Sequence, residues 1–164
     1  MSNKNNNTNN LFKVVAQNKK ARFNYEILET LEAGIVLLGT EVKSLRKGNM
    51  SLQEGYIEVD GNELFLINTH IAEYSFFGQN SHEPTRRRKL LLQRKQISKL
   101  TEKVKLKGTT IVPLKLYFNN RGIAKLEIAL AKGKNLYDKR STIKEKEAKK
   151  DAEKALKMYR KTSI

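Results

Sequence analysis

The 164-residue sequence has no cysteine, no tryptophan and only two prolines. Without thiols the chain can form no disulfide, no thiolate metal site and no cysteine nucleophile, and nothing indicates an oxidising compartment. The sequence also lacks an uninterrupted apolar run of about 18 residues, and it lacks a basic start followed by an apolar stretch. We therefore expect a cytoplasmic protein that neither spans a membrane nor is secreted.

Acidic residues are too few to balance the basic ones. The chain has 17 Asp and Glu against 33 Lys and Arg, for a formal net charge of +16. A charge of this size predicts a polyanionic partner. The excess recurs in residues 19–22, 86–107 and 132–164, and this recurrence favours nucleic-acid binding over a merely solvated surface.

The sequence contains no arrangement of residues that indicates catalysis. His70 and His82 stand in unrelated contexts, with neither a nucleophile nor a metal-ligand motif beside them. Glu26, Glu29 and Glu32 do not suit a metal site, because their spacing in a strand puts Glu29 on the opposite face from the other two. We expect a protein that is not an enzyme and that needs no cofactor or metal.

Composition divides the chain into three segments. Residues 1–17 have Asn at six of the first ten positions and no hydrophobic period, which predicts a flexible arm. Residues 18–131 carry regular apolar patterns and should form the folded domain. Residues 132–164 hold 12 Lys and Arg against 5 Asp and Glu. They predict a basic tail that is disordered until bound and becomes helical on a surface.

Hydrophobic periodicity and turn residues predict a mainly β domain. The expected elements are strands over 23–32, 34–38 and 90–92, hairpins over 56–67 and 110–130, helices over 41–47 and 97–107, and a loop over 74–85. Thr40 is the expected N-cap of the first helix, and Pro113 suits a sheet edge or a bulge. Short strands with two hairpins and two helices favour a small OB-fold-like β-barrel with peripheral helices.

Five segments give the sequence a more specific character than its charge does. They are residues 18–22 (NKKAR), 32–37 (EAGIVL), 39–46 (GTEVKSLR), 88–92 (RKLLL) and 133–140 (GKNLYDKR). In this order and spacing they resemble the SsrA-binding protein family, small protein B, from about residue 18 to 150. The resemblance implies an OB-type barrel that binds the tRNA-like domain of transfer-messenger RNA. It also implies an adaptor that delivers this RNA to stalled ribosomes for trans-translation.

The resemblance also implies two sets of site residues. The barrel would grip the RNA mainly through Glu32, Leu91 and Gln93. Supporting RNA-binding positions would be Lys19, Lys20, Arg22, Tyr25, Gly39, Glu41, Lys43, Ser44 and Arg46. The second set would lie at the decoding centre of 16S rRNA: Gly133, Lys134, Tyr137, Asp138, Lys139 and Arg140.

Within the second set, Tyr137 would stack on an rRNA base while Lys139 and Arg140 hold phosphates. The tail beyond about residue 141 would become helical in the empty messenger channel. The implied partners are therefore transfer-messenger RNA and the ribosome, with elongation factor Tu reached indirectly through the RNA and no membrane.

The chain departs from the common family pattern at Lys20, Gln93 and Asn135. Lys cannot reproduce a bidentate Arg contact, so the departure at Lys20 affects the expected contact most. Two other interpretations stay open from the sequence. A structural ribosomal protein would have the same basic barrel and tails, and an RNA-processing enzyme would need a site that the sequence does not reveal. Membrane binding by the tail is disfavoured because the tail lacks a large apolar face.

Overall fold

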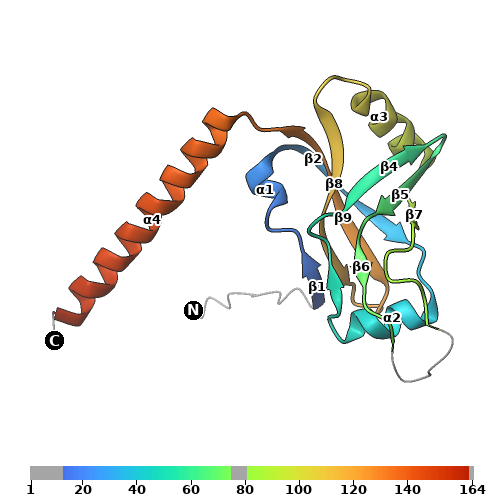
Figure 1. Cartoon of the computed structure of the whole chain (residues 1–164), viewed down its shortest axis with the longest axis horizontal. Coiled ribbons are helices and arrows are strands. Elements are labelled where there is room, and N and C mark those ends of the chain that lie inside the picture. Colours follow the sequence, from blue (N-terminus) through green and yellow to red (C-terminus); the bar gives the residue numbers. More distant parts are fainter. Residues whose placement is uncertain (1–12, 75–80, 163–164) are drawn as a thin grey trace, which may run out of the picture.

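The computed structural model describes residues 13–74 and 81–162 (Figure 1). The strands are β1 (Lys13–Gln17), β2 (Tyr25–Ile35), β3 (Met50–Ser51), β4 (Tyr56–Asp60), β5 (Glu63–Ile67), β6 (His70–Ile71), β7 (Arg88–Leu91), β8 (Thr109–Phe118) and β9 (Ala124–Gly133). The helices are α1 (Ala21–Asn24), α2 (Gly39–Arg46), α3 (Arg94–Val104) and α4 (Leu136–Thr162). Within the described residues no helix is long and apolar enough to cross a membrane.

Seven antiparallel strands form the main sheet in the order β1-β8-β9-β2-β7-β5-β4, and β3 pairs with β6 in a small second sheet. The sheet curls until β4, at one edge, packs against β8, which lies next to the other edge. Figure 1 shows α2 and α3 at opposite ends of this barrel. The predicted mainly β, OB-like fold is therefore confirmed.

Alternation along β9 separates the inside of the barrel from its outer face. Leu126, Ile128 and Leu130 are buried in the main core, whereas Lys125 and Glu127, which alternate with them, are only half-buried. Leu45 of α2 and Leu100 of α3 complete this core from the helices. The apolar stripe of each helix thus covers a part of the barrel interior, as amphipathic surface helices do.

Both predicted hairpins are present. The turn between β4 and β5 contains Gly61 at a φ of 57°, a conformation that glycine adopts without steric cost. The second hairpin pairs β8 with β9, and its register shifts between Pro113 and Lys115. Pro113 therefore lies at a bulge of an interior strand, where its missing N–H removes little pairing, as predicted.

Several predicted boundaries are wrong. Residues 13–17, expected in the flexible arm, form β1 and pair with β8, because Val15 and Ala16 pack against the main core. Residues 25–35 form one strand in place of two, and residues 21–24 preceding it are helical. Thr40 is not the N-cap of α2, since Leu38 holds that position. Residues 1–12, and 75–80 of the predicted loop, lie outside the described residues.

Residues 136–162 form one continuous helix, α4, which projects away from the barrel (Figure 1). The sequence predicted a basic tail that is disordered until bound and becomes helical on a surface, and the structure describes this segment as a helix. Ala, Lys, Glu and Leu dominate the segment and are strong helix formers. About three turns into α4 the ammonium group of Lys146 lies 5.6 Å from the centre of the Phe23 ring. The helix thus contacts the barrel domain at α1.

Replacing Gly55 with Ala should lower the free energy of unfolding by about 1–3 kcal/mol. An added Cβ would overlap Cγ2 of Thr69 and lie 3.3 Å from Cγ of Pro113, where β4 meets β8. Urea unfolding followed by circular dichroism measures the change. Gly39→Ala is the matched control, because no atom lies within 4 Å of its added Cβ. Equal stability of the two variants would contradict the tight closure of the barrel at Gly55.

Candidate nucleic-acid interface

Strand pairing gathers polar side chains on the outer face of the barrel. One row across the sheet joins directly paired positions on four strands: Tyr117 of β8, Lys125 of β9, Gly34 of β2 and Leu91 of β7. The next row joins Lys115, Glu127 and Glu32. We call the side chains of these two rows the outer-face patch: Glu32, Leu91, Lys115, Tyr117, Lys125 and Glu127.

Glu32 is the half-exposed acid at the centre of this patch. One carboxylate oxygen accepts a hydrogen bond from the hydroxyl of Tyr117, and the other lies 3.6 Å from Nζ of Lys125. Burial raises the pKa of Tyr117, and the hydrogen bond to Glu32 raises it further, so this hydroxyl stays protonated and donates. The carboxylate is thus held in place while 53% of the Glu32 side chain remains exposed.

A shallow concavity of about 390 Å³ lies beside Glu32. It extends from Glu32 and Lys125 to the turn between β8 and β9, where it is lined by Asn119, Asn120, Arg121 and Ile123. This concavity is therefore bordered by an acceptor, Glu32, by two cations, Lys125 and Arg121, and by the exposed apolar side chain of Ile123. Such a space can take a donor-bearing group next to a phosphate.

Leu91 lies on the same outer face, one strand away from Glu32. It pairs with Gly34, and a Cβ added to Gly34 would lie only 3.1 Å from Cβ of Leu91. The absence of a side chain at 34 leaves room for Leu91, which is 52% exposed. Gln93 follows at the N-cap of α3, where its backbone N–H bonds the side chain of Gln96 and its own side chain is exposed. The structure therefore brings Glu32 and Leu91 together and places Gln93 just beyond them.

Helix α1 covers another part of the outer face. Ala21 packs with Ala129 and Ala131 in a second apolar cluster that Tyr25 also contacts. Ala129 lies two residues from Glu127 on β9, so both belong to the same face. The exposed cations carried by α1 and the turn before it are Lys19, Lys20 and Arg22. They therefore lie on the same face of the sheet as Glu32. Tyr25 is half-buried and packs against the second apolar cluster.

Helix α2 presents only some of its predicted contacts. Lys43, Arg46 and Gly39 are exposed, but Glu41 and Ser44 are buried. The hydroxyl of Ser44 donates to the carbonyl oxygen of Ala72 at 2.6 Å. The expectation that Glu41 and Ser44 contact RNA is corrected: both side chains hold α2 against the barrel from inside.

Glu41 is the centre of a buried ion network. Its carboxylate accepts hydrogen bonds from Nε of Arg88 at 2.8 Å, from Arg86 at 2.7 Å and from the backbone N–H of Leu38 at 2.7 Å. Burial alone would raise the pKa of Glu41, but the hydrogen bonds from Arg86 and Leu38 and the charge of Arg88 outweigh it and lower the pKa. Glu41 is therefore more readily ionised in the fold than an ordinary glutamate is.

The basic block over 86–107 is partly neutralised. Arg87 pairs with Asp60 and Glu58, Lys89 pairs with Glu63, and Arg86 and Arg88 share Glu41. Lys99 and Lys103 of α3 lie 3.0 and 2.5 Å from Glu29, and their hydrogen bonds lower its pKa. Among the described residues, the cations of this block without an ion pair are Arg94, Lys95, Lys105 and Lys107. The block therefore offers less free positive charge than its sequence indicated.

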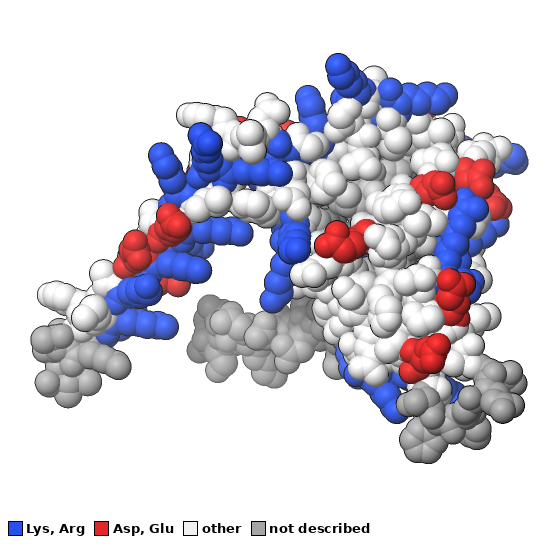
Figure 2. Space-filling model, viewed as in Figure 1, with Lys and Arg blue, Asp and Glu red and all other residues white. Residues whose placement is uncertain are grey.

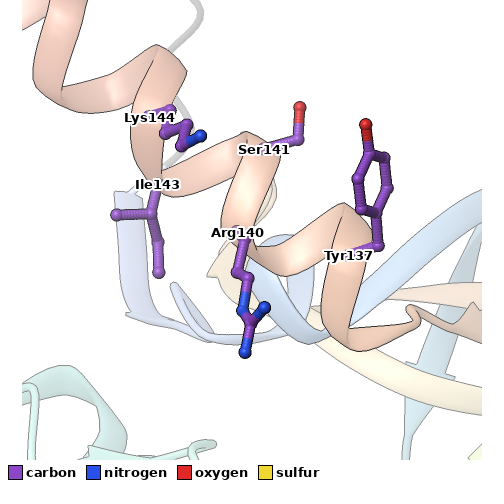
Figure 3. A pocket seen from close by; sticks show the side chains of 5 residues that line it. All are labelled: Tyr137, Arg140, Ser141, Ile143 and Lys144. Atoms are coloured by element: carbon purple, nitrogen blue, oxygen red, sulfur yellow. The ribbon is translucent and has the colours of Figure 1, made fainter.

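The start of α4 carries the second predicted set. Tyr137 is 82% exposed, Asp138 and Arg140 are exposed, and Lys139 is half-buried. Figure 3 shows Tyr137 and Ser141 projecting to one side of the helix and Arg140 to the other. Together with Ile143 and Lys144 they border an open concavity of about 440 Å³. Asp138 lies in the first turn, where a negative charge suits the helix dipole.

A short link fixes this helix to the barrel. Gly133 ends β9 and is exposed, and the backbone N–H of Lys134 donates to the carbonyl of Asn24 at 3.0 Å. The side chain of Lys134 reaches the carbonyl of Arg22 at 3.3 Å. The two hydrogen bonds of Lys134 therefore hold the chain just before α4 against α1. Along α4 itself, Figure 2 shows Lys and Arg with acidic residues between them.

The sequence did not reveal Tyr117 or Lys125 as site residues. Alternation along residues 124–130 does put Lys125 and Glu127 on one face of a strand. Their approach to Glu32 depends on β2 pairing with β9 across about 95 residues of chain, which single-strand patterns do not encode.

The fold and this surface define a small basic β-barrel of the oligonucleotide-binding type with a cationic helical arm. The family model described as "SmpB protein" matches residues 15–158. The chain belongs to the SmpB family.

Its relatives and a solved structure agree with this assignment. The chain is 55% identical over 143 residues to the SsrA-binding protein of Chelativorans sp. (strain BNC1), covering 87% of the chain and 92% of the relative. It is 57% identical over 135 residues to the SsrA-binding protein of Rhodopseudomonas palustris (strain TIE-1), covering 82% and 86%. A chain from a structure described as "tmRNA-SmpB: a journey to the center of the bacterial ribosome" superposes with a TM-score of 0.62 at 48% identity, covering 73% of this chain and 84% of that one.

Proposed function

We propose that this protein binds the tRNA-like domain of transfer-messenger RNA and delivers that RNA to stalled ribosomes for trans-translation. The observation that carries the proposal is the outer-face patch, in which an exposed, fixed Glu32 lies beside Leu91 in a strongly basic protein of the SmpB family. The names of its relatives and the description of the matched structure support the same partner RNA and the ribosome.

The barrel would divide recognition between affinity and selectivity. Lys19, Lys20, Arg22, Lys43 and Arg46 are exposed and can neutralise phosphates, which gives affinity without sequence preference. Glu32 can accept hydrogen bonds from base amino groups or 2′-hydroxyls, and Leu91 and Gln93 add apolar and amide contacts beside it. A site of this kind would recognise a folded RNA by its shape and exposed edges.

The arm α4 would act on the ribosome. Tyr137 offers a largely exposed ring for stacking on an rRNA base, and Lys139 and Arg140 would offer cations for phosphates at the decoding centre. The remainder of α4, rich in Lys, would lie in the empty messenger channel. Elongation factor Tu would be reached indirectly, through the RNA.

We infer an adaptor without catalytic activity, cofactor or metal that works in the cytoplasm alongside ribosomes. The described part of the chain contains no group of three His, Asp or Glu side chains placed to hold a metal. Buried His82 is fully engaged: Nδ1 lies 3.0 Å from Oγ1 of Thr40 and Nε2 lies 3.1 Å from the carbonyl oxygen of Ile71. These contacts support a structural use of this histidine.

The proposal is tested by competition binding near physiological salt, in which the tRNA-like domain of transfer-messenger RNA competes with bulk tRNA. Strong preference for the tRNA-like domain is expected, because charge alone gives salt-sensitive binding without preference. Equal binding would overturn the proposal and favour a structural ribosomal protein.

Glu32→Gln should weaken binding of the tRNA-like domain by about tenfold, since a charged acceptor for RNA donors is lost. The direction is diagnostic, because electrostatics alone would strengthen binding when a negative charge is removed. Glu26→Gln is the matched control: Glu26 lies on the same strand, is exposed and carries the same charge. Similar affinities of the two variants in fluorescence anisotropy would contradict a special role for Glu32.

A further inference from the structure

Two glutamates face each other on the outer-face patch and have different partners. Glu32 and Glu127 are directly paired positions of β2 and β9, where like charges repel. Glu127 lies 2.9 Å from Nζ of Lys115, while Glu32 is bonded to Tyr117 and lies near Lys125. Both carboxylates are therefore held by side chains of β8, Glu127 by Lys115 and Glu32 by Tyr117.

Tyr117 differs from the other groups around Glu32 because it is rigid and neutral. It is only 7% exposed, and its place in β8 between β1 and β9 leaves its ring little freedom. The ammonium group of Lys125 lies 3.6 Å from the Glu32 carboxylate at the end of a long flexible side chain. It adds positive charge near the carboxylate but does not fix the direction in which the carboxylate points. Tyr117 is thus the partner that fixes the orientation of the Glu32 carboxylate.

A fixed carboxylate still has accepting capacity to spare. An ionised carboxylate has about four lone-pair sites, and Tyr117 fills one of them. Glu32 borders the concavity of about 390 Å³ that Arg121 and Ile123 also line. An acceptor held at the rim before binding loses less rotamer entropy when RNA donors arrive.

We infer that Tyr117 is a positioning residue for RNA recognition, which orients Glu32 to accept from an exocyclic amino group or 2′-hydroxyl of a nucleotide in this concavity. The inference rests on the proposed function and deepens it. It assigns to a buried tyrosine a part of the selectivity for transfer-messenger RNA.

The experiment is a double-mutant cycle on the full chain with Tyr117→Phe and Glu32→Gln. The phenylalanine keeps the ring and removes only the hydroxyl. Dissociation constants are measured for the tRNA-like domain and for bulk tRNA at several salt concentrations. Tyr56→Phe is the matched control, because Tyr56 is an exposed tyrosine on β4 outside the patch.

Tyr117→Phe should weaken binding of the tRNA-like domain by about fivefold, with an unchanged salt slope and little change for bulk tRNA. In the Glu32→Gln background the same substitution should have almost no effect, because no charged acceptor remains to be oriented. An equal loss in both backgrounds would mean a structural role and would overturn the inference, as would wild-type affinity of Tyr117→Phe. A wild-type chain without preference for the tRNA-like domain would instead overturn the proposed function.

Discussion

Simultaneous replacement of Asp138, Lys139 and Arg140 by alanine should abolish peptide tagging on stalled ribosomes and leave affinity for the tRNA-like domain within about twofold of wild type. These residues lie in the first turns of α4, beyond the barrel and its outer-face patch. Hydrogen bonds to charged partners contribute about 1.5–3 kcal/mol each, so the loss of two cations that we propose to act at the decoding centre should reduce productive engagement by about 100-fold or more. A reconstituted translation system with a messenger that lacks a stop codon measures tagging directly.

The same arm supplies a matched control. Residues 149–151 (KKD) also contain two cations and one acid, and all three are exposed on α4. Alanine replacement there changes the net charge by the same amount, two turns or more further along the helix. It should keep most of the tagging activity if position matters more than charge. Equal loss of tagging in both triple variants would show that the arm works only as a basic tether.

The strands of the barrel were predictable because one of their faces is buried. Along residues 124–130, apolar and polar positions alternate, and the structure has the apolar set inside. Both hairpins were likewise predictable from their turn residues. The patterns failed where a boundary depends on a distant strand: Val15 and Ala16 look like arm residues until β8 offers them a place in the sheet.

Charge was a weaker guide to the site than periodicity was to the fold. Residues 86–107 were one of three basic segments that favoured nucleic-acid binding, yet Arg86, Arg88, Lys99 and Lys103 form ion pairs with acids far away in sequence. A cation's availability depends on such partners, which only the tertiary fold determines. The same holds for Glu41: the family resemblance implied an RNA contact there, but the fold buries its side chain completely.

Glu41→Ala should lower the free energy of unfolding by about 3–5 kcal/mol, because it leaves the guanidinium of Arg88 buried without its counter-charge. Neither side chain is exposed at all, and both remain hydrogen-bonded in a region that water does not reach. Guanidinium chloride or thermal unfolding measures the loss. Glu63→Ala is the control: it removes the exposed partner of Lys89 and should cost less than about 1 kcal/mol.

If Glu41→Ala does not fold, the double variant Glu41→Leu/Arg88→Met keeps the idea testable. Replacing both members of a buried pair with apolar groups is far less costly than removing one, so this variant should be more stable than Glu41→Ala. The carbonyl oxygens of Thr69 and Pro84 lose their Arg88 donors, so recovery should be partial. If the double variant were no more stable than Glu41→Ala, the buried unpaired charge of Arg88 would not be the cause of the lost stability.

The buried pair also sets the response of stability to acid. The folded-state pKa of Glu41 lies below its ordinary value of 4.5, so the unfolded chain binds the proton more readily than the folded one. The stabilising contribution is therefore fully present above about pH 5 and is lost as pH falls through the folded-state pKa. Unfolding midpoints between pH 7 and pH 3 should fall more steeply for the wild type than for the double variant.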